Sequence, residues 1–221
     1  MNQIQSDDHF SKLHQAASQG NIDKILKHVK KIDVNLVDDT GRTPLHIAAS
    51  EGHLRAVTIL IDHGADLNIQ DNRGKTSLGV AVESGSKDVV ECLLKAGAAV
   101  DIPDICGETV VHAAVHCQVE DVLGLLVRRG ANPDIINYNG ESALHLAVTG
   151  NDAASVDILL RAGAMVNIRS HHLVTPLMLA AGKANTHIIT SLLEFGARVE
   201  DTDKEGNDAY FYANNKKKVC M

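Results

Sequence analysis

The sequence contains no tryptophan, and aromatic residues make up only 3% of its 221 positions. Because apolar residues still reach 44%, the core has to be built from Ala, Leu, Ile and Val. The four cysteines include no Cys-x-x-Cys pair and are too few for a disulfide framework, which fits a reducing compartment. No secretory signal opens the chain and no apolar run is long enough for a membrane. We therefore expect an intracellular protein, cytoplasmic or nuclear, with no membrane partner.

Signals for catalysis and for nucleic-acid binding are also missing. The formal net charge of -7 argues against the basic surface that DNA or RNA requires. Gly74-Lys75-Thr76 looks like the end of a phosphate-binding loop, but Ile69 stands where that loop needs its first glycine. No metalloprotease, nucleophile-elbow, dinucleotide or zinc-knuckle motif occurs. We therefore expect neither enzymatic activity nor a cofactor.

One segment, Thr43-Pro44-Leu45-His46-Ile47-Ala48, returns along the chain in steps of 33 residues. Its later copies begin at Thr76, Thr109, Ser142 and Thr175, and an imperfect copy begins at Ser11. A fixed period of this size predicts a repeat protein in which small units stack on their neighbours.

Each unit predicts two short helices and an extended connection. Thr43 is placed as an N-cap and Pro44 as the first helical residue, and the helix ends at Gly52. A second helix follows with apolar residues at helical spacing and ends at Gly64, where a positive φ is expected. Asp71 and Gly74 then mark a turn before the next unit. Helices this short are unstable alone, so each must bury its apolar face on the next unit.

The Thr-Pro-Leu-His-x-Ala signature, the flanking glycines and the period together resemble the ankyrin repeat, over residues 8 to 215. The resemblance implies an all-α repeat fold: an ankyrin solenoid of stacked helix-turn-helix units with β-turn fingers, whose usual function is protein-protein interaction. The expected organisation is a disordered N-terminus (1–7), an N-terminal capping repeat (8–39), five repeats (40–72, 73–105, 106–138, 139–171, 172–204), a truncated C-terminal cap (205–215) and a basic tail (216–221).

The resemblance also assigns a structural role to the signature residues. In the family the signature histidine forms a hydrogen bond with the signature Thr hydroxyl and with nearby backbone. The resemblance therefore implies a structural role for Thr43, Pro44, His46, His112, His145, Thr175 and Pro176. Gly79 and Met178 replace the histidine in two repeats, which should therefore lack this bond. We do not expect these histidines to bind ligands.

Two places depart from the repeat pattern. Leu173 stands where the other fingers have glycine. The last copy ends in Tyr210, Phe211 and Tyr212. We expect their bulk to close the final apolar groove, with one or two of them packed inward.

Positions that do not repeat, at the finger tips and the ends of the first helices, form the expected partner-binding surface. Interfaces favour apolar, tyrosine and arginine anchors, so the centre is expected at Ile105 and Tyr138. The predicted binding residues are Arg42, Arg73, Lys75, Ile105, Cys106, Glu108, His116, Tyr138, Glu141, His171 and His172. The expected function is a non-catalytic adaptor, inhibitor or regulatory subunit, monomeric on its own, that binds another protein.

Two alternative functions and one candidate modification remain open. The chain could be the recognition domain of a larger channel, kinase or ubiquitin-ligase assembly. The chain could also be a metal-binding or enzymatic protein, an alternative that depends only on Cys106, His116 and Cys117. With His171 or His172 these residues offer soft metal ligands, but distances across two units make a metal site unexpected. By family resemblance, the spacing of Leu60, Asp66 and Leu67 makes Asn68 a candidate for asparaginyl hydroxylation; the competing reading is a turn residue.

Overall fold

The structure, a computed structural model, describes residues 7–183 and 185–215. These residues form thirteen α-helices and one isolated antiparallel bridge, between Ile136 and Ser142. The expected all-helical repeat fold is confirmed. The basic tail and residues 1–6 of the expected disordered N-terminus lie outside the described residues, whereas Asp7 already begins the first helix. The chain divides into two compact units, with residues up to 105 in the first and residues from 106 in the second.

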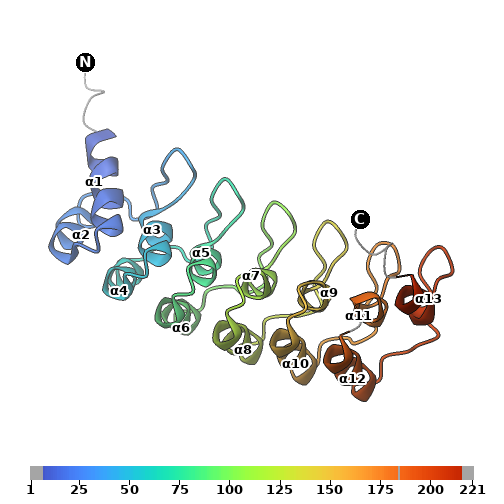
Figure 1. The fold of residues 1–221 in the computed structure, drawn as a ribbon. Coiled ribbons are helices and arrows are strands. Elements are labelled where there is room, and N and C mark those ends of the chain that lie inside the picture. The colour runs from blue at the N-terminus through green and yellow to red at the C-terminus, as the bar shows by residue number, and fades with distance from the viewer. Residues whose placement is uncertain (1–6, 184, 216–221) are drawn as a thin grey trace. The chain divides into compact units, whose positions relative to one another are not determined.

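The first unit holds three helix pairs (Figure 1). They are α1 (Asp7–Ser18) with α2 (Ile22–His28), α3 (Pro44–Ser50) with α4 (Leu54–Asp62), and α5 (Ser77–Glu83) with α6 (Lys87–Lys95). The first helix of each pair contacts the first helix of the next pair, and the second helices contact one another in the same way. The result is two parallel layers of helices, with the loops on the side of α3 and α5.

Local sequence explains where these helices begin and end. The hydroxyl of Thr43 accepts a hydrogen bond from the backbone N–H of His46 at 3.3 Å, and Pro44 occupies the first helical position of α3. After α4, Gly64 adopts a φ of +84°, which glycine allows at little cost. Leu45, Val57 and Leu60 are fully buried between the layers. Burial of each such side chain contributes about 1.5–3 kcal/mol, so packing rather than helix propensity stabilises the repeat.

The second unit continues the same pattern. Its pairs are α7 (Val110–His116) with α8 (Glu120–Arg128), α9 (Ala143–Thr149) with α10 (Ala153–Arg161), and α11 (Pro176–Lys183) with α12 (Thr186–Glu194). A last helix, α13 (Ala209–Asn214), packs on α11 as a first helix would, and no second helix follows it within the described residues.

The connections between pairs form fingers held by repeated hydrogen bonds. The carboxylate of Asp71 accepts from the backbone N–H groups of Arg73 and Lys75 at 2.8 and 2.9 Å, and the N–H of Gly74 donates to the Asp71 carbonyl. Neighbouring fingers are also joined: in the first unit the N–H of Ile105 donates to the Arg73 carbonyl at 3.2 Å. The finger tips are therefore ordered platforms for exposed side chains.

The finger containing Leu173 departs from the others in sequence but not in backbone. Leu173 adopts a φ of +59°, close to the values of the glycines it replaces. Its N–H donates to the Ser170 carbonyl at 2.9 Å, and the N–H of Ser170 donates to the Val174 carbonyl at 3.0 Å, as in the glycine-containing turns. A side chain in this left-handed region costs about 1–2 kcal/mol, so the surrounding repeat imposes the turn on an unsuitable residue.

The expectation that the terminal aromatic residues close the last apolar groove is wrong. Tyr210 and Phe211 are exposed, and only Tyr212 is half-buried. The Tyr212 hydroxyl donates to the Asp203 carboxylate at 2.8 Å, and burial together with that carboxylate raises the pKa of the phenol. The aromatic residue that packs inward therefore anchors the last finger, and the groove beside α13 stays open.

Candidate protein-binding surface

In the repeat that begins at Thr43, a buried histidine joins the signature to the next finger. The N–H of Thr43 donates to Nδ1 of His46 at 3.1 Å, so the proton resides on Nε2, which donates to the Lys75 carbonyl at 3.0 Å. Burial lowers the pKa of His46, because the interior disfavours imidazolium, and the bond to the Lys75 carbonyl opposes this only in part. His46 is therefore a structural link in its neutral form.

The same link recurs elsewhere in the chain. Nε2 of His112 lies 3.2 Å from the Glu141 carbonyl, and Nε2 of His145 lies 3.0 Å from the Val174 carbonyl. His14, which the list of signature residues omitted, contacts the Arg42 carbonyl at 2.9 Å. Its place in the imperfect copy that begins at Ser11 was the signal that could have identified it.

The two repeats without the histidine differ from each other. At Gly79 only the N-cap contact remains, from the Gly79 N–H to the Thr76 hydroxyl at 3.3 Å. In the repeat with Met178, the sulfur takes the place of the imidazole and accepts from the Thr175 N–H at 3.4 Å. The expected loss of the imidazole bond is confirmed in both.

A polar groove of about 650 Å³ lies on the first unit, between the fingers and the ends of the first helices. Predicted residues Arg42 and Arg73 both line it. Its other lining residues are Thr40, Ser50, Asp71, Asn72, Val80, Glu83 and Ser84. The fold thus brings together two arginines 31 positions apart in the sequence.

Charged side chains of the polar groove are held by neighbours. Nε of Arg42 donates to the Thr40 hydroxyl at 3.0 Å and lies 3.5 Å from the Asp38 carboxylate. Burial alone would raise the pKa of Asp38, but hydrogen bonds from Thr40 and Arg42 outweigh it and lower the pKa. Lys75 forms an ion pair with Glu83, and its side chain is only 13% exposed. Arg73 is exposed, and the Arg42 side chain remains 41% exposed.

Predicted residues of the second unit form a separate cluster. Nε2 of His116 lies 3.1 Å from the Glu108 carboxylate, which also accepts from the Asn137 side chain at 3.3 Å. Tyr138 is 71% exposed, yet its N–H donates to the Cys106 carbonyl at 2.9 Å. The Tyr138 ring also lies on the adjacent finger, where a Cβ at Gly107 would come within 2.7 Å of it. Tyr138 is therefore a large exposed ring with a fixed backbone.

The remaining predicted residues are placed as follows. Ile105 is 63% exposed on the last finger of the first unit. Cys106 and Cys117 are exposed. Among the described residues, no three His, Cys, Asp or Glu side chains are arranged to hold a metal ion. Exposed positions are also occupied by His171 and His172, and Glu141 is partly buried.

Asn68 has a structural partner at the base of a finger. Its side-chain oxygen accepts from the Ala99 N–H at 2.9 Å, while its own N–H donates to the Asp66 carboxylate at 2.9 Å. Equivalent side chains, Asn35 and Asn167, accept from Asp66 and Arg198 in the same way. This repeated contact joins consecutive repeats within each unit.

The paired helices, the fingers and the histidine links define a repeat protein of helix-turn-helix units. Models of the ankyrin repeat match residues 13–104, 96–170 and 172–204. The chain belongs to the ankyrin repeat family, whose repeats bind other proteins and form a typically non-catalytic scaffold. In the described part of the chain, no helix has the length and apolar character needed to cross a membrane.

Known proteins agree with this assignment. Ankyrin repeat domain-containing protein 7 of Homo sapiens is 46% identical over 55 residues, which is 24% of this chain and 22% of that protein. The match thus spans less than a quarter of the relative. The ankyrin repeat domain of Bcl-3, a unique member of the IkappaB protein family, superposes with a TM-score of 0.88 at 26% identity. The match covers 94% of this chain and 96% of that one. The human ASB11 ankyrin repeat domain superposes with a TM-score of 0.76 at 29% identity, covering 94% and 93%.

Proposed function

We propose that this chain is a non-catalytic adaptor, inhibitor or regulatory subunit that binds a partner protein through its fingers and the ends of its first helices. The observation that carries the proposal is the contrast between two sets of residues. Signature residues such as Thr43 and His46 are buried and bonded to one another. Their non-repeating neighbours, such as Arg42 and Arg73, line an open polar groove.

Chemically, the surface suits a protein better than a small molecule. The polar groove presents arginines, hydroxyls and two carboxylates that already have partners, Asp71 in the finger turn and Glu83 with Lys75. It therefore favours a segment that brings acidic or hydrogen-bonding groups to Arg73. Ile105 and Tyr138 add exposed apolar and aromatic area on their own units. Tyrosine and arginine are the residues that most often dominate binding energy at interfaces. We expect the chain and its partner to meet inside the cell, in the cytoplasm or the nucleus.

The test is proximity labelling in the native cell with a surface variant and a matched control. The variant carries Arg73→Glu, Ile105→Asp and Tyr138→Ser. The control carries Arg55→Glu, Met165→Asp and Phe195→Ser, which are also exposed positions. Labelled partners should disappear with the variant and persist with the control, while both proteins keep their helical circular dichroism. If the variant retains the partners and the control loses them, the binding surface lies on the outer helices instead.

A second candidate function is the recognition domain of a larger assembly. It is supported by the structural similarity to an ankyrin repeat domain, that of human ASB11. The same labelling experiment separates the candidates, because a stable assembly would label the same few proteins in constant proportion, and these would co-purify with the chain.

Hydroxylation of Asn68 also stays a prediction. The modification would have to spare the bond from the Ala99 N–H to the Asn68 side chain. Intact-mass analysis of the protein from animal cells tests it: a gain of one oxygen that Asn68→Ala abolishes would support the modification.

A further inference from the structure

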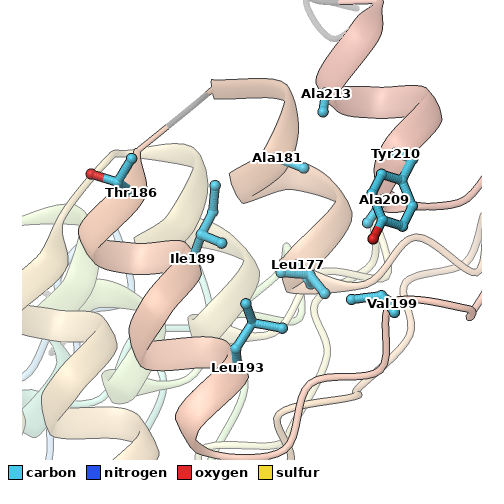
Figure 2. A pocket seen from close by; sticks show the side chains of 9 residues that line it. All are labelled: Leu177, Ala181, Thr186, Ile189, Leu193, Val199, Ala209, Tyr210 and Ala213. Carbon is cyan, nitrogen blue, oxygen red and sulfur yellow. The ribbon is translucent and has the colours of Figure 1, made fainter.

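An apolar groove of about 410 Å³ lies on the second unit beside the last helix, away from the residues of the proposed binding surface. Figure 2 shows that its side chains come from α11, α12 and α13 and from the finger that precedes α13. The lining residues are Leu177, Ala181, Thr186, Ile189, Leu193, Val199, Ala209, Tyr210 and Ala213. Thr186 is the least apolar of them, so the groove offers a surface for hydrophobic contact.

Repeat positions show what normally covers such residues. Tyr210 occupies the position of Leu144 and Leu177, which are 1% and 2% exposed, but it is itself 67% exposed. Leu193 occupies the position of Leu160, and its exposure is 44% against 2%. The groove therefore contains repeat positions that are buried in the earlier repeats but exposed here.

In the other repeats of the unit, a helix covers these positions. Within the second unit, α9 packs on α10 and α11 packs on α12, so each first helix is covered by the second helix of its own pair. The second helices also pack on one another, α8 on α10 and α10 on α12. The exposed side of α12 and the open side of α13 continue this established interface, which at every earlier repeat of the unit receives a nine-residue helix.

We propose that the apolar groove binds an amphipathic helix of a partner protein, in the position that the second helix of a complete repeat occupies. The helix that fits has the chemistry of α10: two to three turns with apolar side chains at the spacing of Val156, Leu159 and Leu160. Binding a helix by its apolar face in a groove is a common mode of recognition.

The test uses the full chain and a peptide of residues 151–163, labelled with fluorescein and stapled on the face opposite Leu159. The staple is needed because a helix this short is marginal in water. The control peptide carries Val156→Asp and Leu160→Asp, which remove the apolar face. Fluorescence anisotropy should show saturable binding of the first peptide and at least tenfold weaker binding of the control.

Protein variants locate the site. Leu193→Asp and, separately, Tyr210→Ser should each weaken binding of the stapled peptide by about tenfold or more, a loss of about 1.4 kcal/mol. Met165→Ser changes a similarly exposed side chain outside the groove and should leave the affinity unchanged. Val199→Asp repeats the test on another lining residue, and circular dichroism verifies folding of each variant.

Other occupants give different results, and each would overturn the proposal. Equal binding of the two peptides, or equal binding by wild type and the groove variants, would show that the apolar groove is not the binding site for the helix. A dimer in sedimentation that Leu193→Asp dissociates would assign the groove to a second copy of the chain. A tenfold gain in peptide affinity after deletion of residues 216–221 would assign it to the tail.

Discussion

The polar groove of the first unit and the apolar groove of the second are built from opposite kinds of repeat position. Arg42 in the polar groove is replaced by Lys75, Glu108, Glu141 and Val174 in later copies, so its chemistry is free to vary. Ile189 in the apolar groove is preceded in the repeat by Val57, Val90, Leu123 and Val156, all fully buried. A polar groove therefore arises where the repeat varies, and an apolar groove arises where the repeat is interrupted.

The largest expected effect compares one repeat position in two surroundings. Leu144→Ala removes a buried side chain and should lower the free energy of unfolding by about 2–5 kcal/mol. Tyr210→Ala, at the same repeat position in the open groove, should cost less than about 1 kcal/mol. Urea unfolding of both variants measures this. Similar losses would mean that Tyr210 is packed, and the comparison between the grooves would fail.

The next effect concerns the link behind the polar groove. His46→Ala removes the partner of the Lys75 carbonyl and of Thr43, which leaves buried polar groups unsatisfied. The free energy of unfolding should fall by about 1–3 kcal/mol. Chemical denaturation monitored by circular dichroism measures the change, with the exposed His63→Ala as control. Equal effects of the two substitutions would show that the His46 link contributes little to the stability of the fold.

Stability should also depend on pH through these histidines. Burial lowers the pKa of His46 and of His145, although carbonyl bonds oppose the shift. Below the ordinary value of 6.5 the unfolded chain therefore binds more protons than the folded chain, so stability falls as pH falls. The pKa values of Asp38 and Asp203 are also lowered, from 3.8. Protonation of these two carboxylates therefore reduces stability only at lower pH.

Thermal unfolding between pH 7 and pH 5 provides the measurement. The melting temperature should decrease over this range in the wild type, and the slope should be smaller in a His46→Gln, His145→Gln double variant. A melting temperature that stays constant or rises as pH falls would contradict the neutral, buried state of these side chains.

The smallest predicted effect is a gain in the helix that forms one wall of the polar groove. Gly79 lies within α5 without a positive φ, and an added Cβ would approach other atoms no closer than 3.8 Å. Gly79→Ala should raise the free energy of unfolding by about 0.5–1 kcal/mol, because glycine is the poorer helix former. Denaturant titration tests it. A loss of stability would mean that the helix needs the glycine for a close contact.

The sequence was enough to predict the repeat because its signals are local and occur many times. Thr43, Pro44 and Gly64 mark helix ends through backbone geometry that depends on a few neighbouring residues. The period also placed Arg42 and Arg73 on one surface, and the structure shows both in the polar groove. Because each weak local signal recurs at the same position of every repeat, the helix ends could be predicted from the sequence.

Features that depend on a missing or distant neighbour were beyond this kind of prediction. Tyr210 has the repeat position of a core residue, and only the absence of a second helix among the described residues explains its exposure. The Lys75–Glu83 ion pair joins a residue just before α5 to the last residue of that helix. Leu173 adopts a glycine conformation because its neighbours impose it. In each case tertiary surroundings outweigh local preference.

The most direct test of the account is a saturation scan of the chain with two readouts, cellular abundance and capture of the partner recovered by proximity labelling. Substitutions at repeating positions such as Thr43, His46 and Leu144 should lower abundance and capture together. At non-repeating positions such as Arg73 and Tyr138, substitutions should lower capture while abundance stays unchanged. If capture-specific losses were concentrated on outer helices such as α4 and α10 instead, the assignment of binding to the fingers and first helices would be contradicted.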